Sequence, residues 1–405
     1  MQLSRKGSFM NKPKRKSKAK LKSVQNIPFL GFLLIGLCLA LCIVNLITPQ
    51  KAWSAVEDRP LKSASSLDWK EVGQTGFASE AEEVYADQFA GRKALLHLNY
   101  LFRTTMNQTE INGVYIGKDM LFLDESAEDP MTALKAVSSI SSFLNAAGLP
   151  GTLMVVPSSM TIEKDRLPAF VETNKETEVL EQIAASAADP IVLADVKPAL
   201  EAAADEYIYY RTDHHWTSLG ASIGAKTMLE AMGKSFNIDD YQSLQVSNSF
   251  CGTLASKTGS LGLKDDVYLA PPVIDPQYVV TWADGTRTAS IYNSKALSTK
   301  DQYQVFLGAN QSVVRIETDN DSEENLLLFK DSYANSLVQY LLPYFASITI
   351  VDPRYYTDDL TSLLDQDGIT ACAFVYSCNT FSTGTDLSTV LDAAVSDLNA
   401  RAQSE

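Results

Sequence analysis

The chain has 405 residues, of which 49 are acidic and 34 basic, so its formal net charge is −15. Nine of the basic residues lie in the first 27, which leaves 25 basic against 49 acidic side chains, a net of −24, in residues 28–405. A domain with that charge is repelled by nucleic acid and by anionic lipid surfaces, which excludes nucleic acid as a binding partner.

An uncharged, mostly apolar segment, residues 28–48, follows the basic tail of residues 1–27. About 20 apolar residues suffice for a helix to cross a bilayer, and the basic flank then stays in the cytoplasm. We therefore predict a single-pass transmembrane helix in the cell membrane, with the C-terminal domain extracytoplasmic. Secretion after cleavage is the alternative, because Ala52-Trp53-Ser54 resembles a signal-peptide cleavage site.

Residues 49–75 are predicted to form a stalk, and residues 76–405 the external domain. The spacing predicts one helix over Phe77–Phe102, with His97 as a hydrogen-bonded histidine beside the core. A hairpin is predicted over Gly113–Leu123.

Outside the predicted membrane helix there are three cysteines, too few for a disulfide framework. They are Cys251, Cys372 and Cys378. A bridge between the last two is conceivable, but we favour buried free thiols.

Helices and short apolar strands alternate from Met131 onward. The predicted order is a helix to Ala147, then strand 152–156, helix 176–187, strand 191–193, helix 197–204 and strand 207–210. Such alternation is the signature of an α/β fold with a parallel sheet and helices on both of its faces.

Residues 236–318 interrupt this alternation. They are rich in Ser, Thr, Asn and Gly, and strand-like runs flank Asp284-Gly285, which is a hairpin signal. We interpret the stretch as a mostly β insertion. Alternation then resumes with strand 326–329, helix 333–342, strand 348–351, helix 358–364, strand 371–376 and helix 387–398.

Two of the three histidines stand in Asp213-His214-His215-Trp216, between the predicted strand 207–210 and a segment with helical spacing, 217–232. Loops at this place in α/β folds carry the chemistry, and histidine exchanges its proton near neutral pH. In an extended chain, residues two apart point to the same side. Asp213 is therefore predicted to orient the His215 ring, while His214 points the other way.

A candidate nucleophile follows strand 326–329, in Lys330-Asp331-Ser332. A serine at the start of a helix is held rigidly, and the backbone amide of Ser332 is a candidate oxyanion donor. A serine becomes a nucleophile only beside a base with its own orienting group, so we predict a triad of Ser332, His215 and Asp213. Helix capping by Asp331 or Ser332 is the structural alternative.

A metal site is the competing interpretation of the histidine pair. Adjacent histidines rarely converge on one ion, and neither a third histidine nor a His-x-x-x-His spacing accompanies them. We predict no metal and no cofactor. Ser158 and Ser159 also follow a strand, but the strand that carries the histidines favours Ser332.

Several stretches together resemble one protein family. Asp213–Trp216 is similar to the signature of the DHHW family, and the pattern is matched further by Gly113–Leu123, Pro157–Pro168, Phe250–Gly259 and Lys330–Asn335. That family in turn resembles the SGNH-hydrolase-like domains of alginate O-acetyltransferases, which have Asp-x-His-Trp and, much later, an Asp-Ser or Thr-Ser nucleophile. The resemblance implies an SGNH-hydrolase-like, flavodoxin-like fold with Asp213, His215 and Ser332 in these roles.

The resemblance also implies roles for residues around the triad. Similar domains use an arginine and a tyrosine, which makes Arg354 and Tyr376 candidate substrate or oxyanion residues; a surface ion pair and a core-edge ring are the alternatives. His214 replaces the usual threonine of the alginate enzymes and is predicted to support the loop, with substrate contact as the alternative. Trp216 is predicted to pack under the loop, and Asp331 to support Ser332.

These observations favour a serine acyl-ester enzyme, an O-acetyltransferase or acetylesterase that acts on a cell-surface polysaccharide. Similar transferases work beside a membrane-bound O-acyltransferase, which is the implied partner. The alternative is a non-catalytic surface protein with the same fold that binds glycan or an envelope protein.

Overall fold

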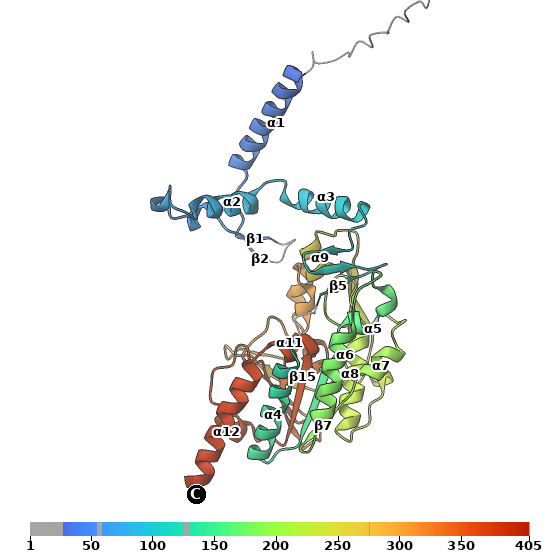
Figure 1. Ribbon diagram of the computed structural model, residues 1–405. Helices are drawn as coiled ribbons and strands as arrows, with labels where there is room; N and C mark the ends of the chain where they lie inside the picture. The colour runs from blue at the N-terminus through green and yellow to red at the C-terminus, as the bar shows by residue number, and fades with distance from the viewer. Residues whose placement is uncertain (1–26, 55–58, 125–128, 275, 405) are drawn as a thin grey trace, which may run out of the picture. The chain divides into compact units, whose positions relative to one another are not determined.

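The computed structural model describes residues 27–54, 59–124, 129–274 and 276–404 (Figure 1). The predicted basic tail lies almost entirely outside them. The chain forms two compact units. The first comprises the described part of Met1–Lys51 together with Lys62–Ala90, and the second comprises Ala52–Leu61 and Gly91–Glu405.

The first unit contains α1 (Ile27–Ile47), two short 3-10 helices, η1 (Ala64–Ser66) and η2 (Trp69–Glu71), and α2 (Phe77–Gln88). Helix α1 coincides with the predicted apolar segment. Within the described ranges, none of the helices combines the length and apolarity needed to cross a membrane.

The helix predicted over Phe77–Phe102 is two helices. Helix α2 ends at Gln88, and α3 (Arg92–Thr105) begins after Gly91, in the other unit. Glycine is unfavourable inside a helix, and here Gly91 takes the cap position of α3. His97 on α3 is hydrogen-bonded as predicted, its Nδ1 lying 3.1 Å from the Gly259 carbonyl oxygen.

An eight-stranded mixed sheet organises the second unit, in the order β11-β10-β12-β14-β13-β15-β6-β7. The strands β14, β13, β15, β6 and β7 run parallel, as predicted, whereas β12, β10 and β11 pair antiparallel. The bounds are β6 (Gly151–Val156), β7 (Ile191–Leu193), β10 (Tyr278–Thr281), β11 (Arg287–Thr288), β12 (Val313–Thr318), β13 (Asn325–Lys330), β14 (Ser347–Val351) and β15 (Ala371–Ser377).

The predicted β insertion is therefore only partly separate from the sheet. Strands β10, β11 and β12 extend the sheet, and the hairpin predicted around Asp284-Gly285 joins β10 to β11. Strands β8 (Leu244–Phe250) and β9 (Asp265–Leu269) form their own antiparallel pair. The same region contains α9 (Thr253–Thr258) and the 3-10 helices η4 (Ile238–Asp240), η5 (Ser294–Ser298) and η6 (Gln302–Val305).

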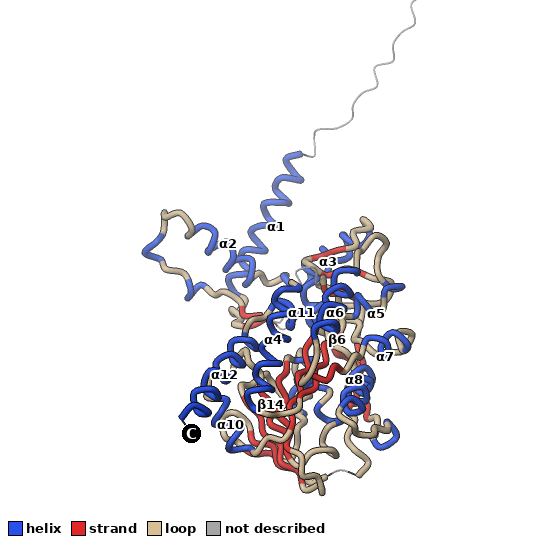
Figure 2. Tube along the Cα trace, turned by 60° about the horizontal axis from the view of Figure 1, so that its bottom comes forward, coloured by secondary structure: helices blue, strands red, loops and turns tan. Residues whose placement is uncertain are grey.

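Helices cover both faces of the sheet, as the α/β prediction requires. In Figures 1 and 2, α4 and α12 lie on one side of the strands and α8 on the other. Along β13, Leu327 and Phe329 enter the core under α4 and α12, while Leu326 and Leu328 enter the core under α8. This alternation follows from the two-residue period of a strand, so a continuously apolar strand fills two cores.

Helices α4, α6, α7, α8, α10 and α12 lie close to their predicted positions. The hairpin over Gly113–Leu123 is formed by β4 and β5, with β3 added. The bounds are β1 (Trp53–Ser54), β2 (Arg59–Pro60), β3 (Glu110–Ile111), β4 (Val114–Ile116), β5 (Leu121–Leu123), α4 (Pro130–Ala147), α5 (Ser159–Ile162), η3 (Lys164–Arg166), α6 (Asn174–Ser186), α7 (Lys197–Ala202), α8 (Ser218–Ala231), η7 (Ser332–Ser336), η8 (Val338–Tyr340), α10 (Leu360–Asp367), α11 (Cys378–Thr383) and α12 (Asp386–Ser404).

The segment after Ser332 and two of the cysteines in this unit also had predicted structures. The helix expected over 333–342 is replaced by the short 3-10 helices η7 and η8. Cys372 and Cys378 are buried and are not joined in a disulfide, as favoured from the sequence.

Candidate active site

The loop that carries the two histidines precedes α8 but does not follow a strand of the sheet. The predicted strand Tyr207–Tyr210 is wrong: it makes one isolated bridge, from Tyr209 to Trp216. The amide of Tyr210 donates to the His215 carbonyl, at 3.1 Å, so the chain folds back on itself. The loop is therefore not part of the sheet, and local backbone pairing contributes to its conformation.

The structure brings the three predicted triad residues together. His215 Nε2 lies 2.8 Å from Ser332 Oγ, and His215 Nδ1 lies 2.6 Å from Asp213 Oδ1. Asp213 and His215 are 2% and 6% exposed. His215 and Ser332 stand 117 positions apart in sequence, so the fold itself creates their contact. This arrangement allows the imidazole to take the serine proton while the carboxylate stabilises the resulting cation.

Asp213 is held from four directions. Oδ1 accepts from the amide and from Nδ1 of His215, and Oδ2 accepts from the amide and hydroxyl of Thr253, at 2.8 and 3.0 Å. Burial alone would raise the pKa of Asp213, but the neighbouring histidine rings and these hydrogen bonds hold the pKa well below its usual range. The carboxylate is therefore ionised at neutral pH.

Gly252 allows α9 to approach this carboxylate. A Cβ at that position would lie 2.4 Å from both Cβ and Oδ2 of Asp213. The first amide of α9, that of Thr253, thereby reaches the carboxylate, which is favourable because helix N-termini attract negative charge.

The His215 ring lies between two other rings. The Tyr303 ring stacks on it with a centroid distance of 3.9 Å and an interplanar angle of 12°, and the His214 ring lies 3.9 Å away at 37°. The Tyr303 hydroxyl also donates to the Ser332 carbonyl, at 2.8 Å. Tyr303, from η6, is a site residue that the sequence reasoning missed, since nothing in its local sequence marks it.

The orientation predicted for His214 is wrong. The rings of His214 and His215 face one another instead of pointing apart. The prediction assumed an extended chain, whereas residues 211–215 form a series of bends. Burial and the neighbouring His215 lower the pKa of His214 to about 3, so its ring is neutral at physiological pH.

Asp331 caps η7, the 3-10 helix that begins at Ser332, which is the structural alternative named for this residue. Its Oδ1 accepts from the Tyr333 amide, at 2.9 Å, and its Oδ2 accepts from the amide and hydroxyl of Ser377, at 2.9 and 2.7 Å. Ser377 ends the neighbouring parallel strand β15, so Asp331 joins two strand ends beneath the serine. The Ser332 amide makes no hydrogen bond within the described residues, and it stays the candidate oxyanion donor.

Trp216 packs beneath the loop, as predicted. Its ring is fully buried, and Nε1 donates to the Tyr333 carbonyl, at 2.9 Å. Gly224 on α8 makes room for the ring, since a Cβ there would lie 2.5 Å from it. The Tyr333 hydroxyl in turn donates to the His214 carbonyl. Trp216 and Tyr333 therefore tie the histidine loop to the serine turn.

Arg354 and Tyr376 line one small cavity of about 20 Å³. Arg354 binds Asp352 through two hydrogen bonds of 2.8 and 2.7 Å, and its side chain is 31% exposed. Tyr376 is buried, and among the described residues its hydroxyl has no hydrogen-bond partner. The cavity is large enough for about one water molecule. Substrate roles for these two residues stay predictions.

Lys330, just before the serine turn, is a buried cation that the sequence reasoning left without a role. Its Nζ lies 3.2 Å from Asn310 Oδ1, 2.9 Å from Asn335 Oδ1 and 3.4 Å from Asp352 Oδ2. Burial lowers the pKa of Lys330, while Asp352 opposes that shift. These contacts tie the end of β13 to the Asp352–Arg354 pair.

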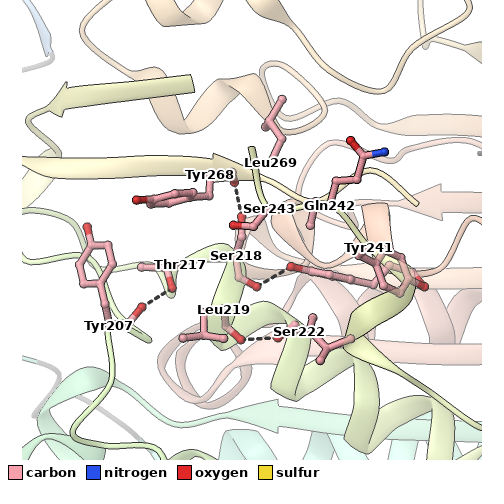
Figure 3. A pocket seen from close by; sticks show the side chains of 13 residues that line it. Tyr207, Thr217, Ser218, Leu219, Ser222, Tyr241, Gln242, Ser243, Tyr268 and Leu269 are labelled. Carbon is pink, nitrogen blue, oxygen red and sulfur yellow. Dashed lines mark hydrogen bonds between the residues drawn. The ribbon is translucent and has the colours of Figure 1, made fainter. Parts of the chain in front are cut away.

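A larger pocket, of about 440 Å³, backs onto the same loop (Figure 3). The Thr217 hydroxyl donates to the Tyr207 carbonyl, at 2.7 Å, and the Ser218 hydroxyl donates to the Tyr268 carbonyl. No triad residue lines this pocket. The pocket is therefore separate from the candidate active site.

Asp213, His214 and His215 are close enough together for a metal site to be considered, with ligand atoms within 4.8 Å of one another. However, both oxygens of Asp213 already accept two hydrogen bonds each. A metal at Asp213 would have to displace these donors, so the residues fit the triad geometry better than a metal centre.

Comparison with known proteins places the chain in a family. Residues 114–325, more than half of the chain, match the model of the SGNH hydrolase-like domain of acetyltransferase AlgX. The chain belongs to this family. The matched range includes Asp213 and His215 and ends just before Ser332.

Several solved structures share the fold. A DHHW family protein from Eubacterium siraeum is 25% identical, with a TM-score of 0.62 over 70% of this chain and 96% of that one. PatB1 from Bacillus cereus is 20% identical, with a TM-score of 0.58 over 67% and 98% of the two chains. A PatB1 structure with a sulfonyl adduct is 18% identical, with the same TM-score and 67% and 97% of the chains covered. No curated protein matches the chain significantly.

Proposed function

We propose that this chain is a serine acyl-ester enzyme that transfers acetyl groups to a cell-surface polysaccharide. One observation carries the proposal, the continuous hydrogen-bonded line from Asp213 through His215 to Ser332 Oγ. Membership in the acetyltransferase AlgX family supports the choice of acetyl transfer over other acyl chemistry.

The chemistry follows from the geometry. His215 Nε2 removes the Ser332 proton as Oγ attacks the acetyl carbonyl carbon of the donor, and Asp213 stabilises the imidazolium. The imidazolium then protonates the leaving group, and an acetyl ester remains on Ser332. In the second half, His215 takes a proton from an acceptor hydroxyl, whose oxygen attacks the ester and releases Ser332. Water as the acceptor would make the same site an esterase.

The proposal is tested by covalent labelling. Because a sulfonyl adduct exists for the PatB1 relative, a sulfonyl fluoride and a fluorophosphonate are suitable probes. We expect both to label the wild-type protein at Ser332, located by peptide mass spectrometry, and to fail with Ser332→Ala. The matched control is Ser159→Ala, because Ser159 also follows a strand and is buried, but lies in none of the contacts described above. Labelling that survives Ser332→Ala would show that another residue is the nucleophile and would overturn the proposed triad, whereas no labelling at all would favour a non-catalytic surface protein.

We also propose that the N-terminal segment anchors this domain outside the cell membrane, beside a membrane-bound O-acyltransferase that supplies acetyl groups. The uncharged segment 28–48 behind nine basic residues supports the anchor. Membrane fractionation and protease access to the C-terminal domain in intact cells test the location. Recovery of uncleaved protein in the soluble fraction would contradict it.

A further inference from the structure

Among Asp213, His214 and His215, the side chain of His214 is the most exposed. Its side chain is 29% exposed, against 7% for His215 and 2% for Asp213. The ring nevertheless has a fixed position, because its Nδ1 lies 3.0 Å from Thr253 Oγ1 and the ring packs against that of His215, with centroids 3.9 Å apart. A fixed, partly exposed ring beside the catalytic residues is suited to contact a substrate.

The contacts of His214 define which ring nitrogen carries its proton. The Thr253 hydroxyl lies 3.0 Å from Asp213 Oδ2, and a carboxylate is a stronger acceptor than a neutral imidazole. With the hydroxyl proton given to Asp213, Thr253 Oγ1 accepts from His214 Nδ1, also at 3.0 Å. Asp213 Oδ1, 3.5 Å from the same nitrogen, favours a proton there as well.

Nε2 of His214 is therefore an unprotonated acceptor. Within the described residues, it makes no hydrogen bond. The lowered pKa of His214 keeps the ring neutral at the pH at which His215 acts as a base. Two neighbouring imidazoles thus hold different roles, one relaying a proton and the other only accepting a hydrogen bond.

We propose that His214 Nε2 binds a second hydroxyl of the acceptor, adjacent to the hydroxyl that His215 deprotonates. Nδ1 of both rings faces Asp213 Oδ1, at 2.6 Å for His215 and 3.5 Å for His214. Both Nε2 atoms therefore lie on the far side of two rings whose centroids are 3.9 Å apart, where neighbouring hydroxyls of one sugar can reach them. The site then selects acceptors with vicinal hydroxyls over simple alcohols and water. This inference rests on the proposed acetyl transfer and adds the class of acceptor.

The step remains chemically balanced. One hydroxyl of the diol gives its proton to His215 Nε2, and its oxygen bonds to the acetyl carbon. The bond from that carbon to Ser332 Oγ breaks, and Oγ regains a proton from His215. The second hydroxyl keeps its proton and donates it in a hydrogen bond to His214 Nε2, which orients the acceptor for attack.

The test compares two small acceptors, propane-1,2-diol and propan-1-ol, with p-nitrophenyl acetate as the donor. The ratio of the two esters is measured by NMR at equal hydroxyl concentrations. It depends only on steps after the acetyl-enzyme forms, so changes in acylation do not affect it. We expect the wild type to favour the diol, and His214→Phe to reduce that preference about 3- to 10-fold, the effect of one hydrogen bond.

A second variant guards against a general disturbance of the loop. His214→Gln retains an acceptor oxygen and should keep part of the diol preference, while His214→Phe retains only the ring shape. Equal ester ratios in all three proteins, or a wild type that does not prefer the diol, would overturn the acceptor role while probe labelling of Ser332 persists. Loss of that labelling in the wild type would overturn the proposed function itself.

Discussion

Single residues decide how His215 acts as a base. The pairing of Asp213 with His215 was predictable, because both stand in one tetrapeptide and the family pattern assigns their roles. Tyr303 was not, since a tyrosine 88 positions later becomes a neighbour only through folding. Thr253 was not predictable either. Its hydroxyl donates to Asp213 and so accepts from His214 Nδ1, which sets the tautomer of His214.

Tyr303 should affect catalysis through two separable contacts. Tyr303→Phe keeps the stack on His215 but loses the hydrogen bond to the Ser332 carbonyl, whereas Tyr303→Leu loses both. Each contact contributes about 0.5–1.5 kcal/mol, so we expect acylation to slow about 3-fold in the first variant and about 10-fold or more in the second. The rate of fluorophosphonate labelling measures this. Equal rates in both variants would mean that the stack does not position His215.

His214 should make stability depend on pH. Folding lowers its pKa from about 6.5 to about 3, so between these values the unfolded chain binds a proton that the folded chain does not. Stability is therefore lost as pH falls from about 6.5 towards 3, by at most about 1.4 kcal/mol per pH unit. His214→Gln removes the titrating group, and its unfolding free energy in urea should fall less steeply over this range. Parallel pH profiles would contradict the assignment.

At the scale of elements, periodicity was a good guide where a segment belongs to the sheet or packs on it. Strand β13, whose consecutive apolar residues fill two cores, was located within one residue at each end. The failures share a cause. Tyr207–Tyr210 has strand-forming residues but pairs mainly with its own loop, and β10, β11 and β12 looked like an insertion because antiparallel pairing cannot be read from one strand.

The approach of α9 to Asp213 gives an element-scale prediction. Gly252→Ala would place a methyl group 2.4 Å from the Asp213 carboxylate and push the helix start away. Small displacements of catalytic groups cost up to about 100-fold in rate, so we expect Ser332 labelling to slow by about 10- to 100-fold. Gly262→Ala is the matched control, because its Cβ would meet nothing within 4 Å. Equal labelling rates would show that the Thr253 contacts to Asp213 are dispensable.

At the scale of the whole molecule, the second compact unit contains all of the residues that the proposed chemistry needs. The buried residues of the two cores that cover the faces of the mixed sheet run from Met120 onward, and the triad residues are Asp213, His215 and Ser332. Family membership predicted this arrangement, while the division of the chain near residue 90 was not foreseen, because helical spacing continues from α2 into α3.

A protein that begins at Gly91 should therefore fold and keep the site. It retains α3, whose Leu96 backbone lies against Gly259 beside α9, and it loses only the short β1–β2 pair from its own unit. We expect a cooperative thermal transition by circular dichroism. We also expect Ser332 to be labelled at a rate within about 2-fold of that of the full chain, since a larger change in rate would indicate that an interaction at the site, such as a hydrogen bond, had been lost. The matched variant is the same protein with Ser332→Ala, which should melt alike but take no label. A truncated protein that melts cooperatively and stays unlabelled would show that residues before 91 complete the active site.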